Sequence, residues 1–300
     1  MELYDVIIIG GGPAGLNAAV VLGRCRRKVL LFDHGKQRNL KSHGMHNYLT
    51  RDNIKPKEFL NIANKEIKKY GVTIKHVAID HADKKNKSHF TVTDANKKNY
   101  HSKKLILATG LKDKLPEIPG AETIYGTSMH HCPYCDGWEA TNKKIAVYAN
   151  QKGGNELALT LTRWSNKITL FTDARKYIRK EEIKNLTKHN IDVITEPIQS
   201  FESRNRKLTN ILLKNGEKYP ADVLFFSNGY EVQCDLVGSL GCIMGKNSLA
   251  LTDKSQQTNI KGLYVVGDAS KDVHFVIVAA AEGAKAGVYI NKELMIEENR

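Results

Sequence analysis

Two cysteines separated by two residues lie near the middle of the chain, in the segment Cys132-Pro133-Tyr134-Cys135. A CxxC turn at the start of a helix lowers the pKa of its thiols, and only the thiolate attacks a disulfide. The proline between them stiffens the turn. The spacing therefore predicts a dithiol that alternates between a reduced form and a disulfide-bonded form.

Polar neighbours of this pair are candidates for handling its protons. Asp136 follows Cys135 directly, and a carboxyl group there could relay a proton as the dithiol opens and closes. His130 and His131 precede the pair, and an imidazolium favours a neighbouring thiolate. We predict Cys132, Cys135, Asp136 and His131 as the catalytic residues, with His131 preferred to His130.

Zinc binding is a competing interpretation of the same residues. His130, His131, Cys132 and Cys135 are four potential ligands, but adjacent side chains do not converge easily on one tetrahedral ion. The sequence contains no second CxxC and no HxxxH. Redox chemistry is therefore favoured, and no metal is expected. The other cysteines lack such a context and are expected to be buried or bystander thiols: Cys25, Cys234 and Cys242.

A glycine pattern near the N-terminus, Gly10-x-Gly12-x-x-Gly15, is the second chemical feature. Gly10 permits a tight turn, Gly12 lets the backbone approach a pyrophosphate, and Gly15 lets a helix pack against a sheet. Amides at the start of that helix face the anion. The pattern predicts a dinucleotide site, and it does not by itself distinguish FAD from NAD.

The elements around these glycines have the order that such a site requires. The apolar run 3–9 precedes the turn, the small-residue segment 16–23 follows it as a helix, and the strand 28–32 ends in Asp33. Asp33 is placed to accept hydrogen bonds from a ribose hydroxyl. A later strand, 104–108, leads into Thr109-Gly110.

The same order of elements recurs in the second half of the chain. A strand over 145–148, a glycine-containing turn, a helix over 156–164 and a strand over 167–171 lead to Asp173. A third apolar strand covers 221–227. The final segment returns to a buried strand, 262–267, followed by Asp268 and a helix over 279–291.

These patterns predict an α/β fold of two Rossmann-like domains, doubly wound and three-layered, with the second inserted into the first. We expect the first, FAD-binding domain to comprise residues 1–113 and 245–300. Residues 114–244 are expected to form the inserted, pyridine-nucleotide-type domain that carries the CxxC pair. A length of 300 residues agrees with two cores.

Composition limits the other classes of function. The formal net charge is +14, and residues 51–104 hold 14 Lys and Arg against 6 Asp and Glu. We interpret this excess as a solvated lysine-rich surface, and no nucleic acid is expected because no nucleic-acid-binding motif accompanies the charge. The N-terminus lacks a signal-peptide pattern, and the apolar run 275–281 is too short to span a bilayer, so a cytoplasmic protein without a membrane is expected.

Four motifs together resemble the low-molecular-weight thioredoxin reductases: GGGPAGLNAA at the N-terminus, ATG at 108–110, CPYCDG at 132–137 and GLYVVGD at 262–268. Their order and spacing match over essentially the whole chain. The resemblance implies a homodimer and electron flow between a reduced pyridine nucleotide, FAD, the dithiol and a disulfide of a thioredoxin-like protein. It also implies that Cys135 meets the flavin and Cys132 meets the substrate. The residues that it implies for FAD are Gly10, Gly12, Pro13, Ala14, Gly15, Asp33, Thr109, Gly110, Gly267 and Asp268.

One part of the pattern departs from this family. Where the family has a second glycine motif, the chain has the segment 149–154, Ala-Asn-Gln-Lys-Gly-Gly. The family's HRR triplet, which clamps the 2′-phosphate of NADPH, aligns with Thr172-Asp173-Ala174, and Asp173 would repel that phosphate. The departure counts against NADPH, and the altered glycine motif counts against NADH as well. Nearby basic residues at shifted positions are possible substitutes: Arg175, Lys176 and Arg179.

The electron partner is therefore open at this stage. A reductase needs NADPH, NADH or a reduced ferredoxin, whereas an oxidase of small dithiols needs only oxygen. The CPYCDGWE form also resembles reductase-like flavoproteins whose substrates are small dithiols. A flavin-containing redox sensor or interaction module with little turnover is the alternative from another class.

Overall fold

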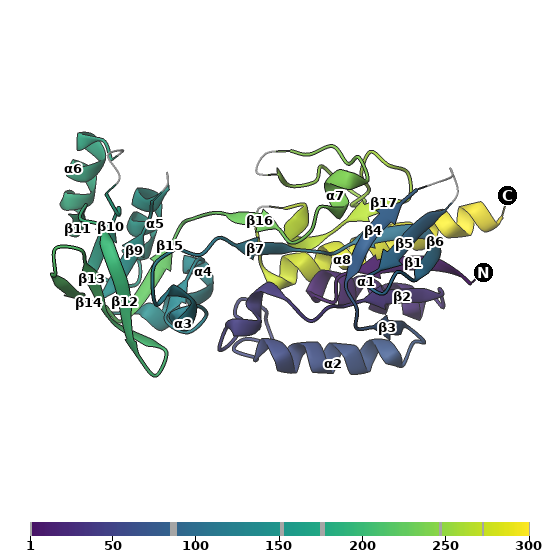
Figure 1. The fold of residues 1–300 in the computed structure, drawn as a ribbon. Coiled ribbons are helices and arrows are strands. Elements are labelled where there is room, and N and C mark those ends of the chain that lie inside the picture. Colours follow the sequence, from purple (N-terminus) through teal and green to yellow (C-terminus); the bar gives the residue numbers. More distant parts are fainter. Residues whose placement is uncertain are drawn as a thin grey trace. The chain divides into compact units, whose positions relative to one another are not determined.

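The computed structural model of the chain describes residues 2–84, 89–150, 153–174, 178–245, 248–271 and 273–299. It contains two compact units (Figure 1). Unit 1 comprises Met1–Leu40, Asn47–Lys112 and Glu231–Arg300, and unit 2 comprises Lys41–His46 and Asp113–Tyr230. Residues 231–244, which the sequence-based boundary gives to the inserted domain, group with unit 1 because Leu236 and Val237 pack in its core.

Unit 1 is built on a seven-stranded sheet with the order β3-β2-β1-β6-β5-β4, and β17 also pairs with β6. The strands β1, β2, β3, β6 and β17 run parallel where they pair, whereas β4 and β5 form an antiparallel extension. The bounds are β1 Leu3–Ile9, β2 Val29–Phe32, β3 Thr73–Lys75, β4 Ile79–Asp83, β5 Phe90–Asp94, β6 Asn99–Leu107 and β17 Leu263–Val265.

Alternate residues of these strands fill two separate cores. Val6 and Ile8 of β1 pack with the helices α1 (Pro13–Arg24), α2 (Pro56–Lys68) and α8 (Val276–Glu298). Ile7 and Ile9 point to the opposite face, where α7 (Leu236–Ser239) and the following segment cover the sheet. Burial on both faces explains the continuous apolar runs in the central strands, which are 6–9 in β1, 29–32 in β2 and 105–107 in β6.

The first and the last helix of unit 1, α1 and α8, pack so closely that their backbones are in contact. A Cβ atom on Gly283 of α8 would lie 1.9 Å from the carbonyl oxygen of Ala14 in α1. One turn further along α8, a Cβ on Gly287 would lie 2.9 Å from Val21. Only glycine fits at Gly283, because a side chain there would overlap a backbone oxygen.

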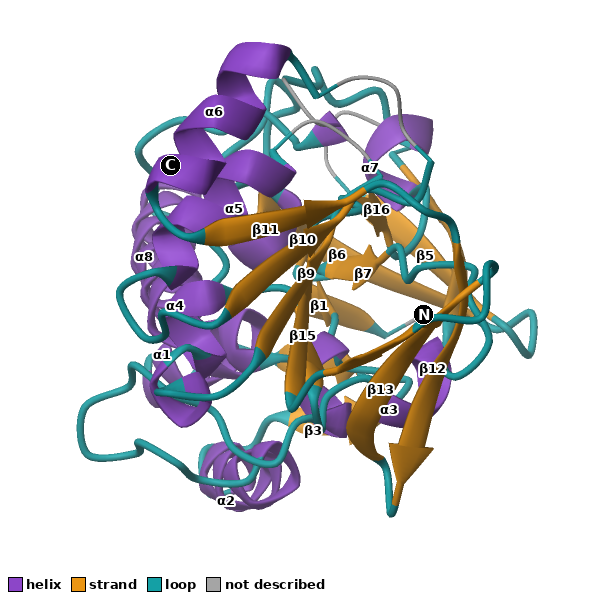
Figure 2. Cartoon of the chain, turned by 90° about the vertical axis from the view of Figure 1, so that its left-hand side faces the viewer, coloured by secondary structure: helices purple, strands orange, loops and turns teal. Residues whose placement is uncertain are grey.

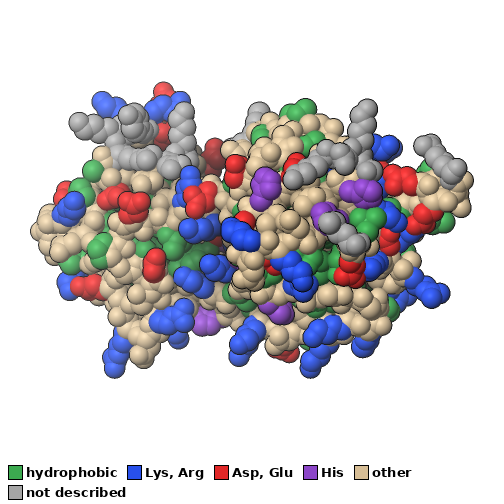
Figure 3. Space-filling model, turned by 45° about the vertical axis from the view of Figure 1, so that its right-hand side comes forward, with side chains coloured by type: hydrophobic (Ala, Val, Ile, Leu, Met, Phe, Trp, Pro, Cys, Tyr) green, Lys and Arg blue, Asp and Glu red, His purple; other side chains and the backbone are tan. Residues whose placement is uncertain are grey.

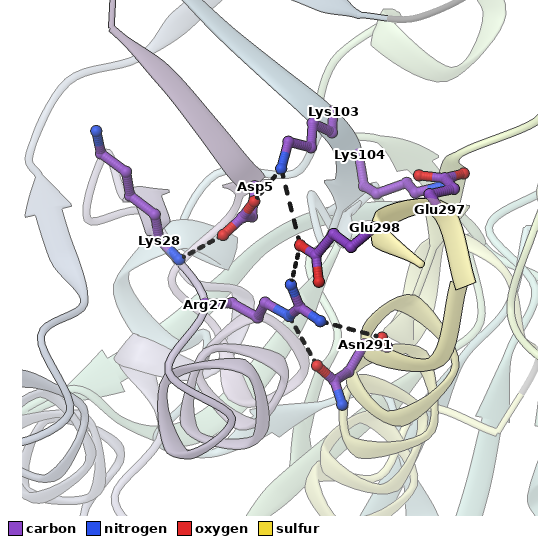
Figure 4. A network of polar contacts seen from close by, with 8 residues as sticks. All are labelled: Asp5, Arg27, Lys28, Lys103, Lys104, Asn291, Glu297 and Glu298. Atoms are coloured by element: carbon purple, nitrogen blue, oxygen red, sulfur yellow. Dashed lines mark hydrogen bonds and ion pairs between the residues drawn. The ribbon is translucent and has the colours of Figure 1, made fainter. Parts of the chain in front are cut away.

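Ion pairs tie the end of α8 to the central strand β6 and to Arg27, in the segment between α1 and β2 (Figure 4). Lys104 of β6 has a side chain that is only 3% exposed, and its Nζ contacts Glu293 at 2.8 Å and Glu297 at 2.7 Å. Arg27 pairs with Glu298 at 2.5 Å. In the same network, Lys103 contacts Asp5 at 2.7 Å, and Asp5 accepts a hydrogen bond from the backbone amide of Lys28.

Unit 2 contains a five-stranded parallel sheet with the order β11-β10-β9-β15-β8. Figure 2 shows α5 and α6 on one side of these strands, while β12 and β13 lie on the other. The bounds are β8 Met129–His130, β9 Ile145–Tyr148, β10 Ile168–Phe171, β11 Ile191–Ile194, β15 Val223–Phe226, α5 Gly154–Leu161 and α6 Lys180–Lys188. The two units confirm the predicted α/β class with two Rossmann-like parts.

The remaining strands and α-helices lie in unit 2 or where the chain passes between the two units. An antiparallel sheet has the order β12-β13-β14. Its strands, the short helices and the two-stranded sheet β7-β16 have these bounds: β12 Ile198–Arg204, β13 Lys207–Leu213, β14 Lys218–Pro220, α3 Ala121–Ile124, α4 Pro133–Asp136, β7 Leu111–Asp113 and β16 Tyr230–Val232. Single 3₁₀ turns cover Arg38–Lys41, Trp138–Ala140 and Gly267–Ala269.

Charged side chains occur over most of the face drawn in Figure 3, with acidic side chains among the Lys and Arg. No helix among the described residues combines the length and the apolar character needed to span a bilayer.

Candidate functional site

The glycine turn of unit 1 lies between the end of β1 and the start of α1. Gly10 has φ +117°, and a Cβ there would lie 2.1 Å from the carbonyl oxygen of Ala108. A Cβ on Gly15 would lie 1.9 Å from the carbonyl oxygen of Gly10. At Gly12, which precedes Pro13 at the first helical position, no atom lies within 4 Å of the Cβ position. The turn therefore leaves open space at the residue expected to approach a pyrophosphate, and it fits a dinucleotide such as FAD.

Asp33 follows β2 and lies against this turn. A Cβ on Gly11 would lie 2.3 Å from the Asp33 carboxyl carbon. The Asp33 Oδ1 accepts hydrogen bonds from the amide of Gly35 at 2.9 Å and from Gln37 Nε2 at 2.7 Å. These two donors fix the carboxylate beside the glycines, in the place where a ribose hydroxyl is bound in dinucleotide folds.

The C-terminal motif reaches the same place. Gly267 has φ +75°, and a Cβ there would lie 3.0 Å from the Cβ of Ala14. Its amide donates to Glu282 of α8 at 2.7 Å. Asp268 Oδ2 pairs with Arg38 at 3.1 Å. Thus residues 267–268, predicted from the motif GLYVVGD, lie beside the glycine turn, with Asp268 held by an arginine.

Glu282 and Arg38 are residues of this site that the sequence did not indicate. Burial raises the pKa of Glu282, while its hydrogen bond from Gly267 and the charge of Lys271 lower it, with the net direction upward. Thr109, also predicted for FAD, forms a side-chain hydrogen bond with Cys234. Gly110 has φ +67°, so this residue after β6 requires the left-handed region that favours glycine.

The dithiol of unit 2 lies at the start of α4. Cys132 is the N-cap residue, and Pro133 takes the first helical position. The amides of Cys135 and Asp136 both donate to the carbonyl oxygen of Cys132 at 3.2 Å. The structure therefore places the CxxC pair at a helix start, as the sequence predicts.

The pKa of the Cys132 thiol lies below its ordinary value. A hydrogen bond from the side chain of Cys135 is the largest cause, and backbone hydrogen bonds from Cys135 and Tyr134 add to it. Burial and the negative charge of Asp136 act in the opposite direction. A lowered pKa gives Cys132 more thiolate near neutral pH, which is what attack on a disulfide needs.

Each of the two histidines before the dithiol has its own carboxylate. His130 Nδ1 lies 3.0 Å from Asp136 Oδ1, and His131 Nδ1 lies 3.5 Å from Asp113 Oδ2. Asp113 also accepts a hydrogen bond from the hydroxyl of Tyr125 at 2.5 Å. The sequence preferred His131, yet His130 is the histidine that contacts the candidate acid Asp136.

The other predicted nucleotide turn, between β9 and α5, is built without a glycine after the strand. Ala149 is buried at this position, and a Cβ on Gly154 would lie 2.1 Å from the Cβ of Ala149. Gly153 has φ +104°. After β10, Asp173 accepts hydrogen bonds from the hydroxyl of Tyr148 at 3.1 Å and from the amide of Ile198 at 2.9 Å.

Three side-chain oxygens at this edge of the sheet are buried and have no hydrogen-bond partner among the described residues: Asn150 Oδ1, Thr172 Oγ1 and Asn228 Oδ1. They follow β9, β10 and β15, which are neighbours in the sheet. The carboxyl edge of a parallel sheet is where ligands bind in such folds, and unpartnered buried oxygens there fit a polar ligand.

Some of the predicted basic substitutes lie outside the described residues, namely Arg175 and Lys176, as do Gln151 and Lys152 of the turn. Arg179 is described, and its side chain bonds to Glu182 at 3.1 Å across the first turn of α6.

The remaining cysteines lie apart from the dithiol motif. Cys25 is exposed and Cys242 is buried. Burial raises the pKa of both Cys234 and Cys242, so these thiols are less reactive than Cys132. Among the residues that the structure describes, no group of three or more His, Cys, Asp or Glu side chains has the arrangement of a metal site.

A glycine cradle in one Rossmann-like unit and a helix-start dithiol in the other define the class of flavin-linked disulfide oxidoreductases. The chain belongs to the pyridine nucleotide-disulphide oxidoreductase family, whose profile matches residues 4–283. Membership makes it an enzyme and implies FAD as its cofactor.

Named relatives cover almost the whole chain. The crystal structure of a putative thioredoxin reductase from Bacillus anthracis is 30% identical with a TM-score of 0.94, covering 98% of this chain and 99% of that one. The thioredoxin reductase of Listeria innocua is 26% identical over 99% of this chain and 95% of its own length. Thioredoxin reductase tcpT of Claviceps purpurea is 29% identical over 99% of this chain and 96% of its own length. These similarities confirm the resemblance predicted from the four motifs.

Proposed function

We propose that the protein is an FAD-dependent thiol-disulfide oxidoreductase of the thioredoxin reductase type. Its Cys132–Cys135 dithiol exchanges electrons between FAD and the disulfide of a thioredoxin-like protein. The observation that carries this proposal is the Cys132 thiol at a helix start, with a pKa lowered by Cys135. The names of the relatives support turnover, in preference to a redox sensor or interaction module.

FAD, when bound, supplies a carrier for two electrons. The residues of this chain that hold it are proposed to be Gly10, Gly12, Pro13, Ala14, Gly15, Asp33, Thr109, Gly110, Gly267 and Asp268. Their role is to bind the pyrophosphate and the sugar-like groups beside α1.

The dithiol performs the exchange with the substrate in two displacements. Cys132 Sγ attacks one sulfur of the substrate disulfide, the substrate S–S bond breaks, and the leaving sulfur takes up a proton. Cys135 then attacks Cys132 Sγ, which releases the second substrate sulfur as a thiol and closes the Cys132–Cys135 disulfide. Two electrons and two protons pass to the substrate, and Asp136 is the proposed acid and base.

Exposed aromatic side chains next to the dithiol support a protein as the substrate. Trp138 is 78% exposed and Tyr134 is 64% exposed, and the Tyr134 ring packs edge-on against Trp164. Large exposed aromatics of this kind are enriched at protein interfaces, where they contribute much of the binding energy.

For the electron donor, we propose a pyridine nucleotide without a 2′-phosphate, namely NADH. Asp173 holds the position after the second strand where dinucleotide folds place the carboxylate for a ribose hydroxyl. Its negative charge opposes the 2′-phosphate of NADPH, and Arg179 is engaged with Glu182. The unpartnered oxygens of Asn150, Thr172 and Asn228 support a polar ligand at this edge.

Anaerobic stopped-flow mixing tests the donor. We expect NADH to bleach the flavin absorbance at least ~10 times faster than NADPH at equal concentration, about 1.4 kcal/mol of discrimination. Equal rates with NADPH would contradict the assignment of NADH. Bleaching only by a reduced ferredoxin or only by a small dithiol would replace NADH by that partner, and in the dithiol case oxygen uptake would identify a dithiol oxidase.

Trapping tests the roles of the two cysteines. The Cys135→Ser variant is expected to accumulate a mixed disulfide between Cys132 and a thioredoxin-like substrate, seen by mass spectrometry. Accumulation in Cys132→Ser instead would reverse the assignment. We also propose a cytoplasmic homodimer, in line with the family resemblance, and light scattering of the purified protein measures that mass.

A further inference from the structure

The two histidines before the dithiol serve different carboxylates because of strand geometry. His130 ends β8 and pairs in register with Phe225 of β15. Successive side chains along an extended segment point to opposite sides. His130 accordingly contacts Asp136 of α4, whereas His131 contacts Asp113 of β7.

His130 is enclosed and fixed on two sides. Its side chain is 13% exposed, and its ring packs against Phe225 with the ring centres 5.7 Å apart. The Asp136 side chain is 19% exposed. Because the Asp136 amide bonds to the Cys132 carbonyl, the backbone of this carboxylate is fixed by the dithiol turn, and its side chain is fixed by His130.

The charge of the Asp136 carboxylate influences the pKa of the attacking thiol, Cys132. The negative charge of Asp136 raises the pKa of Cys132 and so opposes the other influences on that thiol. A hydrogen-bond donor or a positive charge on His130 reduces this effect. The contact between His130 and Asp136 is therefore coupled to the reactivity of Cys132.

We propose that His130 is the positioning residue of the dithiol site, and that its Nδ1 holds the Asp136 carboxyl group in one orientation beside Cys132 and Cys135. This inference rests on the proposed thiol-disulfide exchange. The imidazole and the carboxyl group together take the proton that Cys132 loses before its attack. They return one proton to the leaving sulfur of the substrate, so the pair ends the step with the protons it began with.

The other titratable groups around this pair come from neighbouring elements. Cys132 and Cys135 lie on the same turn as Asp136. His131 with Asp113 and Tyr125 forms the second group, and Glu139 contacts His46 at 3.6 Å. The strand β15 faces His130 with the uncharged Phe225.

Two substitutions separate the hydrogen bond from the charge. His130→Asn keeps a donor near the Nδ1 position but cannot become positively charged, and His130→Ala removes both. His189→Asn is the matched control, because His189 is an exposed histidine of the same unit whose Nδ1 lies 2.8 Å from the carbonyl oxygen of Asn185 in α6.

The first measurement is the alkylation rate of Cys132 in the reduced holoenzyme against pH, with mass spectrometry to identify the modified thiol. We expect His130→Ala to raise the midpoint by about half a pH unit to one pH unit, and His189→Asn to leave it unchanged. The second measurement is single-turnover reduction of a small aromatic disulfide whose thiolate is coloured. His130→Ala is expected to slow it by about 10-fold to 100-fold.

His130→Asn is expected to recover the rate to within about fivefold of wild type, because it keeps a hydrogen-bond donor for the Asp136 carboxyl group. A His130→Ala enzyme with the wild-type midpoint and rate would overturn the inference. If His130→Ala loses stability, the Asn variant decides: a stable His130→Asn enzyme that stays as slow as His130→Ala overturns it too. Turnover retained by Cys132→Ser would instead reject the proposed function itself, whatever the histidine variants do.

Discussion

The two units place a strand, a turn and a helix in the same order, but the turns are constructed differently. In unit 1, a Cβ atom on Gly10 would lie 2.1 Å from a backbone oxygen, whereas a Cβ atom on Gly12 would face open space. In unit 2, Ala149 takes the place of the first glycine, and its methyl group fills the space against Gly154. The shared topology thus preserves a sheet edge, while the residues of the turn decide which phosphate can approach it.

The largest effect is expected from placing a methyl group in the first turn. Gly10→Ala combines a left-handed backbone with a clash against the Ala108 carbonyl, and should destabilise unit 1 by about 2–5 kcal/mol. Denaturant unfolding of the apoprotein measures this. Gly12→Ala is the matched control: it should leave the unfolding midpoint of the apoprotein within error but lower the FAD content. An unaffected Gly10→Ala midpoint would show that the turn relaxes.

Removing the partners of Lys104 should affect unit 1 and leave unit 2 unchanged. The variant with Glu293→Gln and Glu297→Gln leaves a buried ammonium group without a counter-charge, at an expected cost of about 2–4 kcal/mol. Two-step thermal unfolding, followed by flavin release for unit 1 and Trp fluorescence for unit 2, separates the units. A parallel loss in both transitions would contradict the assignment of this effect to unit 1.

The same pairs predict a pH dependence. Burial raises the pKa of Glu293, but hydrogen bonds from Lys104 and Tyr264 outweigh it, so the pKa in the folded protein is below its ordinary value. The stabilisation is therefore complete above the unfolded value of about 4.3 and is lost as the pH falls through the folded pKa. Acid titration of the unfolding midpoint should show this loss in wild type, and a weaker loss in Glu293→Gln.

A smaller effect is expected from removing the charge of Asp173, which follows β10. Asp173→Asn keeps an oxygen for the Ile198 amide and an amide for Tyr148, while it removes the charge that opposes a 2′-phosphate. The NADPH to NADH ratio of flavin-bleaching rates should rise about tenfold, or about 1.4 kcal/mol. An unchanged ratio would show that other residues of unit 2 select the nucleotide.

The smallest effect is expected at Gly153, which is left-handed like Gly10 but has room around it. The nearest atom to a Cβ there is Ser227 Oγ at 3.6 Å, so Gly153→Ala causes no clash. Its only cost is the strain of an alanine at a φ of +104°. We expect about 1–2 kcal/mol in unit 2, measured by denaturant unfolding. A cost equal to that of Gly10→Ala would mean that backbone conformation, and not the clash, dominates both turns.

Structural features that depend on residues close together in the chain can be predicted from the sequence. The glycine turn, the strand that ends at Asp33 and the CxxC pair all lie where the periodicity places them, because local spacing decides them. Helix ends were less predictable. The last helix runs over Val276–Glu298 and not only 279–291, since ion pairs to Lys104 and Arg27 support its polar final turns.

Contacts between segments that are distant in the chain could not be predicted from the sequence. Asp113 and Glu282 carry no local motif, and their partners His131 and Gly267 lie 18 and 15 residues away in the chain. The choice between His130 and His131 depends on which side of a short strand each faces, and one residue of register reverses that choice. No pattern of residue types in the sequence specifies that register.

The backbone contact between Gly283 and Ala14 has a consequence for the order of events during synthesis. The first half of the flavin cradle leaves the ribosome early, but its last strand and the helix that packs on it are translated after the whole of unit 2. Unit 2 can therefore fold while β1 and α1 still wait for their partners. If these residues bind FAD, as proposed, a nascent chain would acquire it late, and a truncation between the end of unit 2 at Tyr230 and the start of α8 would leave a dithiol domain without a complete flavin site.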